Sequence, residues 1–361
     1  MKKLSVFQIT LLAAFGALAV AGVLIFAFAI GGGTTTQIGA VTIWGTLDSN
    51  AFAAVLRQAA EANSSLSQVS YDQKDPATFD SDLTKALAGG TGPDLILLPQ
   101  DSVYKDAAEL VVIPDTLVSQ SQFSSTFIDA ADPFYGTSGA LAFPLLVDPL
   151  VLFWNKDLLA SAGFSSPPEY WDQLFAIAEK VSVKDSSGTI SKSAIDFGEY
   201  QNVDHAKDIL ATLILQVVGT VTGFDSAGHL ISALVPKTGG AAAAAESALT
   251  FYTEFADPSK DFYSWNRALP DGQQAFSAGQ LALYVGYASE RDDISRGNPN
   301  LNFGVAALPQ IRSAPNTSDT ALVYALAASR GGKNPSAAIT VAAALATAAN
   351  SQALSTALGI P

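Results

Sequence analysis

Three residues near position 45 combine a flat aromatic ring with hydrogen-bonding groups. Trp44 ends an apolar run that begins at Val41, and Thr46 and Asp48 follow in the next turn. Ligands of α/β proteins gather at the carboxyl ends of strands, and a polyhydroxylated ligand needs an aromatic face beside carboxylates and amides. This pattern predicts that all three residues contact a ligand. The alternative is that Trp44 packs against the following helix and Asp48 caps it.

The composition excludes several function classes. The chain has 33 acidic and 19 basic residues, a net charge of -14, and no basic run longer than Lys2-Lys3, so a surface that neutralises nucleic-acid phosphates is missing. The lack of cysteine removes disulfides, cysteine nucleophiles, thiolate metal sites and a lipid attached through an N-terminal cysteine. With only His205 and His229, both expected on the polar surface, we predict no metal, no cofactor and no catalytic residues.

The N-terminus carries a long apolar segment. Residues 11–30 are apolar without a break, and about 20 such residues cross a bilayer. The two lysines place this end on the cytoplasmic side and everything after Gly31 outside. A cleaved signal peptide is the alternative, because Ala27-Phe28-Ala29 fits a small-x-small cleavage pattern. We expect residues 1–33 to be an anchor or signal peptide, residues 34–40 a linker, and the folded body extracytoplasmic.

From Val41 onward, short apolar strands alternate with amphipathic helices. Periodicity predicts strands at 41–44, 71–75, 94–98 and 151–155, and helices at 52–60, 78–88, 206–219, 241–256 and 335–349, with a further helix opened by Pro167-Pro168. Such alternation indicates a mostly parallel sheet covered by helices. The GGTGPD segment at 89–94 lacks the lysine of a phosphate-binding loop and precedes a strand, so it is predicted to be a tight turn.

Five segments, in this order, resemble the extracellular solute-binding proteins of ABC importers, the family typified by the maltose- and glycerol-3-phosphate-binding proteins. They are GGTGPDLILL at 89–98, FPLLVDPLVLFWNKDLLASAGF at 143–164, PPEYWDQL at 167–174, AFSAGQLALYVG at 275–286 and NLNFGVAALP at 300–309. The block from 143 to 174 is the most specific. Together the segments extend the resemblance over about residues 41–361.

The resemblance implies the type II periplasmic-binding-protein fold, with two α/β lobes joined by a hinge and a ligand held between them. By motif, lobe 1 spans 40–146 plus 306–324, and lobe 2 spans 147–305 plus 325–361. The crossing strands are expected near 145–148 and 305–308. Relatives usually continue with several more helices, so we expect a shortened or truncated second lobe.

The resemblance also implies ligand-contacting residues. It matches Trp44, Thr46 and Asp48 to the first cleft segment, Asp101 to a polar contact, and Asp148 to a hinge position that faces the cleft. Tyr287 and Ser289 follow the strand at which many relatives carry a stacking tryptophan. Asp101 is alternatively a helix cap, and Asp148 a hinge-stiffening hydrogen-bond acceptor. Trp265 is a further candidate ring, and the amides of Gln201, Asn202 and Gln216 are weaker candidates; Trp154 and Trp171 are assigned to the core.

The resemblance implies a binding protein that delivers a small polar solute, expected to be a sugar or oligosaccharide, to ABC permease subunits in the membrane. A sensor or adhesion protein on the same fold is one alternative. A glycoside hydrolase is another, although no pair of carboxylates stands out as its acid and base. The cleft residues supply acidic and neutral groups, so a neutral carbohydrate is favoured over a phosphate ester. Arg267 and Arg291 would be the first candidates for an anion contact.

Overall fold

The computed structural model describes residues 38–226, 229–234, 241–312, 314 and 317–360. The predicted membrane segment at 11–30 lies outside these residues. The chain divides into two compact units. Unit 1 comprises the described residues up to Leu145 together with Tyr324–Leu354, and unit 2 comprises Leu146–Val323 and the chain from Ser355.

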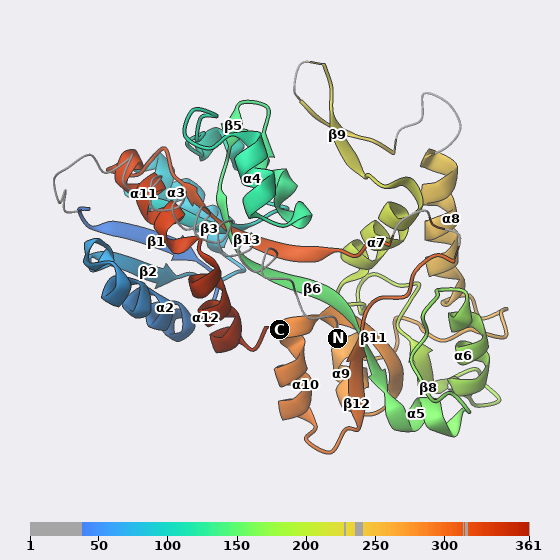
Figure 1. Cartoon of the computed structure of the whole chain (residues 1–361). Helices are drawn as coiled ribbons and strands as arrows, with labels where there is room; N and C mark the ends of the chain where they lie inside the picture. Colours follow the sequence, from blue (N-terminus) through green and yellow to red (C-terminus); the bar gives the residue numbers. More distant parts are fainter. Residues whose placement is uncertain (1–37, 227–228, 235–240, 313, 315–316, 361) are drawn as a thin grey trace, which may run out of the picture. The chain divides into compact units, whose positions relative to one another are not determined.

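Unit 1 alternates between strands and helices (Figure 1). Its complete elements are β1 (Val41–Gly45), α2 (Ser49–Ala62), β2 (Val69–Gln73), α3 (Phe79–Ala88), β3 (Leu95–Pro99), α4 (Gln120–Thr126), β4 (Tyr135–Gly136), β5 (Gly139–Ala140) and α11 (Pro335–Leu345). It also contains most of β13 (Ala321–Ala328) and most of α12 (Ala348–Leu358). Its strands lie in the order β2-β1-β3-β13. β1 is parallel to β2 and β3, whereas β13 is antiparallel to β3. The predicted α/β class is confirmed.

The first helix of unit 1 begins at a side-chain cap. Asp48 Oδ1 accepts a hydrogen bond from the Ala51 amide at 2.9 Å, which satisfies one of the amides left without a helical partner. Phe52 on the buried face of α2 stacks on Tyr71 of β2, with ring centroids 4.2 Å apart. Cap and apolar face together hold α2 against the sheet.

The turn before β3 contains a buried carboxylate that links three segments of unit 1. Gly90 has a φ of +66°, which suits glycine, and the predicted tight turn is confirmed. At its end, buried Asp94 accepts hydrogen bonds from the Thr42 amide at 3.0 Å and the Lys333 amide at 2.8 Å. Asp94 therefore joins β1 to the segment that precedes α11.

Replacing Asp94 with alanine should lower the free energy of unfolding by about 1–3 kcal/mol, because two partly buried amides would lose their acceptor. Urea denaturation followed by circular dichroism measures this change. The matched control is Glu61→Ala at the exposed end of α2, which should leave the midpoint unchanged. Equal midpoints for both variants would contradict a structural role for Asp94.

Unit 2 contains a mixed sheet and a separate hairpin. Its elements are β6 (Phe143–Asn155, from Leu146 on), α5 (Lys156–Ser161), α6 (Gln173–Val181), β7 (Val183–Lys184), β8 (Ile190–Ile195), α7 (Ala206–Val218), β9 (Thr222–Phe224), β10 (Leu230–Ser232), α8 (Ala241–Glu254), α9 (Gly272–Ser277), β11 (Leu281–Tyr287), α10 (Arg291–Gly297) and β12 (Phe303–Ala306). The sheet runs β6-β11-β8-β7, with β12 also pairing with β6. β6 and β11 are antiparallel, and β11 and β8 are parallel.

The core of unit 2 is rich in aromatic rings. Phe175 of α6 stacks on Phe255 with centroids 5.5 Å apart, and Phe251 and Phe262 meet Phe175 edge-on. Trp171 is buried, as predicted, and its indole N–H donates to Gln216 of α7 at 2.8 Å. These contacts join α6 to α8 and the segment that precedes α6 to α7.

The division of the chain differs from the predicted lobes in its C-terminal part. Residues 306–323 belong to unit 2 and 324–354 to unit 1, the reverse of the expected assignment. The Gln216 side chain donates to the carbonyls of Pro309 and Ser318 and holds the first stretch in unit 2. The pairing of Tyr324–Ala328 with β3 then places the second stretch in unit 1.

Among the described residues, no single helix is both long and apolar enough to cross a membrane. α11 and α12 satisfy the length and hydropathy criteria only as a pair, and they are bent by 74° at the break between them. The sequence predicted one helix over 335–349, whereas the structure ends α11 at Leu345 and begins α12 at Ala348.

Candidate functional site

Asp148 and Ser289 meet in unit 2 beside the end of β11. Asp148 lies on β6, two residues before its pairing with β11 begins, and its side chain is buried. Its Oδ1 accepts a hydrogen bond from the Ser289 amide at 3.1 Å. Burial raises the pKa of Asp148, the bonds from Ser289 oppose that rise, and the Glu290 carboxylate adds to it. Two predicted ligand residues are thus brought together from positions 141 apart in the chain.

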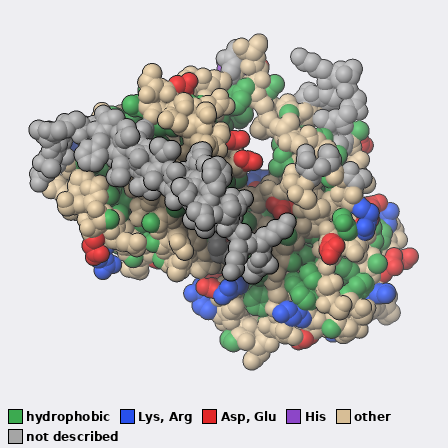
Figure 2. Space-filling model, viewed as in Figure 1, with side chains coloured by type: hydrophobic (Ala, Val, Ile, Leu, Met, Phe, Trp, Pro, Cys, Tyr) green, Lys and Arg blue, Asp and Glu red, His purple; other side chains and the backbone are tan. Residues whose placement is uncertain are grey.

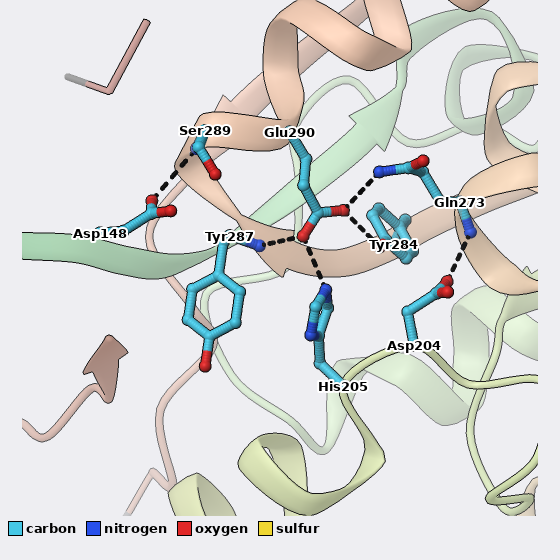
Figure 3. A network of polar contacts seen from close by, with 8 residues as sticks. All are labelled: Asp148, Asp204, His205, Gln273, Tyr284, Tyr287, Ser289 and Glu290. Atoms are coloured by element: carbon cyan, nitrogen blue, oxygen red, sulfur yellow. Dashed lines mark hydrogen bonds and ion pairs between the residues drawn. The ribbon is translucent and has the colours of Figure 1, made fainter. Parts of the chain in front are cut away.

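Glu290 anchors the turn that follows Tyr287 and contains Ser289 (Figure 3). Its Oε1 accepts from the Tyr287 amide at 2.8 Å and lies 2.6 Å from His205 Nε2. Its Oε2 accepts from the Tyr284 hydroxyl at 2.6 Å and from Gln273 Nε2 at 2.7 Å. The carboxylate therefore joins the end of β11, the start of α7 and α9 at one point.

His205 and Glu290 form a largely buried ion pair. Their side chains are 18% and 13% exposed. Burial alone would lower the pKa of His205, but the hydrogen bond and charge of Glu290 outweigh it and raise this pKa. Burial would likewise raise the pKa of Glu290, and His205 with Tyr284 lowers it instead. The His205 ring also meets the half-buried Tyr287 ring edge-on, with centroids 4.8 Å apart.

A hollow of about 510 Å³ adjoins His205 on unit 2. Its lining residues are Tyr200, Gln201, Val203, Asp204, His205, Ala206, Lys207, Asp208 and Asp271. Three of these are aspartates, and Lys207 lies within 3.5 Å of Asp208. Carboxylates accept hydrogen bonds from hydroxyl groups, so the lining suits a polyhydroxylated molecule.

The carboxylate of Asp196 in unit 2 is completely buried. Neither oxygen of Asp196 has a hydrogen-bond partner among the described residues. A Cβ on Gly272 would lie 2.0 Å from Asp196 Oδ2, so only glycine fits at the start of α9. Burial raises the pKa of Asp196 to about 8, the Asp204 and Glu290 carboxylates add to the rise, and His205 opposes it.

The three residues predicted first lie in unit 1, at and after the end of β1. Trp44 is half-buried, and Lys74 Nζ lies 3.9 Å from its ring centroid. Thr46 is half-buried in the turn. Asp48 is exposed and caps α2, which is the alternative role considered for it. A cation at this distance is attracted by the face of the indole ring, so Lys74 covers one face of Trp44.

One predicted ligand residue is enclosed in the core, and another is exposed as its ligand role requires. Trp265 is 1% exposed and packs in the core of unit 2, so its ring faces are occupied by protein. Its indole N–H has no hydrogen-bond partner in the described part of the chain. Asp101 is exposed in the turn after β3 and caps no helix, because the next helical turn, Ala107–Glu109, follows Asp106.

The amide side chains that were weaker ligand candidates differ in burial and in hydrogen bonding. Gln216 and Asn202 are buried, and Asn202 donates to the carbonyls of Asn266 and Leu269, so both have structural roles. Gln201 is exposed at the hollow. His229 is exposed, as predicted, whereas the expectation of a surface His205 is wrong. Trp154 is half-buried against the core of unit 2.

The sequence interpretation missed Glu290 and His205. A glutamate three residues after Tyr287 has the spacing of a capping box, but that motif has Ser or Thr at its first position, so the local sequence does not single out Glu290. The partner of Glu290 is 85 residues away in the chain, so only the fold reveals it.

Within the described residues, no three His, Cys, Asp or Glu side chains come together as a metal site requires. On the face in Figure 2, charged side chains of the described residues lie in small groups, several of which contain both acidic and basic side chains.

A family model described as "Bacterial extracellular solute-binding protein" matches residues 50–352. Binding proteins of Brucella abortus (strain 2308) and Brucella suis biovar 1 (strain 1330) are each 24% identical over 231 residues, which is 63% of this chain. The chain spans about half the length of these curated relatives, 52% in each case.

Solved structures share the fold at lower sequence identity. A protein with mannotriose bound matches with a TM-score of 0.66 at 19% identity, over 89% of this chain and 81% of that one. An ABC transporter solute-binding protein of Thermotoga lettingae bound with α-D-tagatose has a TM-score of 0.64 at 18% identity, over 90% and 81%. A substrate-binding protein of Listeria monocytogenes in complex with cycloalternan has a TM-score of 0.61 at 15% identity, over 86% and 75%.

The buried Asp196 predicts a pH dependence of stability. An aspartate in the unfolded chain loses its proton at about pH 4, whereas buried Asp196 in the folded chain keeps its proton up to about pH 8. Between these pH values the folded state binds more protons than the unfolded state, so the stability of the fold falls as pH rises. Asp196→Asn removes this pH-dependent loss of stability, which amounts to at most about 1.4 kcal/mol per pH unit. The melting temperature of the variant should therefore rise relative to the natural chain between pH 5 and pH 8.

Thermal melts at several pH values measure this difference. Asp261→Asn, which removes an exposed carboxyl of the same unit, is the control and should show no such trend. A constant difference between Asp196→Asn and the natural chain across this range would show that Asp196 is ionised in the fold.

Proposed function

Because the chain belongs to the family of bacterial extracellular solute-binding proteins, we propose that it is the substrate-binding subunit of an ABC importer and that its solute is a sugar or oligosaccharide. The protein binds the solute on the extracytoplasmic side and delivers it to the permease subunits. Residues 11–30 tether it to the membrane or act as its export signal. No chemical step is required of the chain in this role.

The observation that carries the proposal is the convergence of Asp148, Tyr287 and Ser289 on one part of unit 2. Asp148 and Ser289 offer hydrogen-bonding groups, and the Tyr287 ring offers an apolar face for the C–H side of a sugar. Trp44, Thr46 and Asp48 of unit 1 and the exposed Asp101 complete the proposed set. Trp265 is left out of it, because its ring is enclosed in the core.

The charges near these residues favour a neutral solute. The two arginines considered for an anion contact are both engaged: Arg267 Nη2 donates to Glu199 at 3.0 Å, and Arg291 Nε lies 3.5 Å from Asp292. The hollow beside His205 is lined with aspartates, which would repel a phosphate ester. The sugars bound by the structural neighbours, mannotriose, tagatose and cycloalternan, support the same solute class.

Calorimetric titration and thermal shift of the full chain with mannotriose and tagatose test this proposal. At least one of these sugars should raise the melting temperature and bind with a dissociation constant of ~1 μM, equivalent to about -8 kcal/mol. Trp44→Ala and Asp148→Asn should each weaken binding by about tenfold or more, because each removes a ligand contact.

Glycerol 3-phosphate serves as the comparison ligand, and Asp261→Asn as the control variant with an exposed carboxyl changed. Binding of the phosphate ester without binding of either sugar would refute the neutral-sugar proposal. Sugar binding that Trp44→Ala and Asp148→Asn leave unchanged would instead refute the assigned residues.

A further inference from the structure

Glu290 receives four hydrogen bonds and has no capacity left for a solute. Each carboxylate oxygen is within 2.8 Å of two donors: the Tyr287 amide and His205 at Oε1, and Tyr284 and Gln273 at Oε2. A carboxylate offers about four acceptor positions. The side chain is also only 13% exposed. Glu290 therefore acts on other protein groups.

The group it acts on is the turn that follows β11. Tyr287 precedes this turn, and its amide is held by Glu290. Ser289, within the turn, is held by Asp148. A Cβ on Gly286 would lie 2.9 Å from Glu290 Oε2 and 2.5 Å from a ring carbon of Tyr284, so the carboxylate packs directly against the backbone of β11. Glu290 thus fixes the turn at one end, and Asp148 fixes it in the middle.

We propose that Glu290 is a positioning residue for solute binding, which holds the backbone between Tyr287 and Ser289 so that both residues and Asp148 meet the solute together. This inference rests on the proposed function. His205 contributes to this positioning, because its Nε2 at the start of α7 contacts Glu290 Oε1 and its ring meets the Tyr287 ring edge-on. No local pattern around either residue encodes this arrangement, because α7 and β11 are far apart in the chain.

The Ser289 amide gives a direct readout. Its own acceptor is Asp148, and that acceptor remains in place when Glu290 is replaced, so faster hydrogen exchange of this amide reports a loosened turn. In Glu290→Ala, residue-resolved exchange by NMR on the full chain in detergent micelles should be about tenfold faster or more at Ser289. A sugar that binds the natural chain should bind this variant about tenfold more weakly, a loss of ~1.4 kcal/mol.

Glu290→Gln keeps the size of the side chain and one acceptor oxygen, and it should give an intermediate rate at Ser289 and partial rescue of affinity. If Glu290→Ala does not melt cooperatively, Glu290→Gln is the variant that tests the positioning proposal. Glu246→Ala, an exposed glutamate of α8, is the matched control and should change neither quantity.

The proposal is overturned if the Ser289 exchange rate in Glu290→Gln, or in a folded Glu290→Ala, equals that of the natural chain. It is also overturned if Ser289 exchanges faster while the affinity for a bound sugar is unchanged. If the natural chain binds neither mannotriose nor tagatose, the proposed solute class fails, while faster Ser289 exchange in the variants would still establish that Glu290 positions the turn.

Discussion

The antiparallel pairing of β6 with β11 is the constraint on which the structure of unit 2 depends. The register places Leu150 opposite Tyr287 and Trp154 opposite Leu283, and the side chains of β11 are almost all buried. On β6, Asp148, Leu150 and Leu152 are buried and the residues between them are half-buried, so a slip of one residue would exchange the two faces of this strand and the register is specified. Asp148 lies two residues before Leu150 and must then lie beside the turn that follows Tyr287. The Asp148–Ser289 contact is therefore a consequence of strand register.

Three carboxylates show how differently this fold treats acidic groups. Asp94 satisfies backbone amides of segments that are remote in sequence. Glu290 is balanced by His205 and neutral donors. Asp196 has no hydrogen-bond partner in the described residues, and burial favours its protonated form. An unpaired buried charge is costly, whereas a saturated carboxylate can organise several elements at once.

Much of the fold could be predicted from the sequence because the periodic signals are local. The strand at 94–98 and the helices at 78–88, 206–219 and 241–256 correspond closely to β3, α3, α7 and α8. The break between α11 and α12 was not visible, because alanine is favourable throughout both helices. The lobe boundary near 306–324 was also unpredictable, since it depends on long-range hydrogen bonds from Gln216. The same limit concealed His205 and Glu290.

The position of β13 in the chain has a consequence for biosynthesis. β3 carries a run of buried apolar side chains from Leu95 to Leu98, and its neighbour on one side is β13. A ribosome makes all of residues 146–323 before that neighbour is complete, so during this interval one edge of β3 is unpaired in the nascent chain. Unpaired apolar edges invite association with other chains. Unit 2 is almost continuous in sequence, whereas the sheet of unit 1 is complete only when β13 has been made.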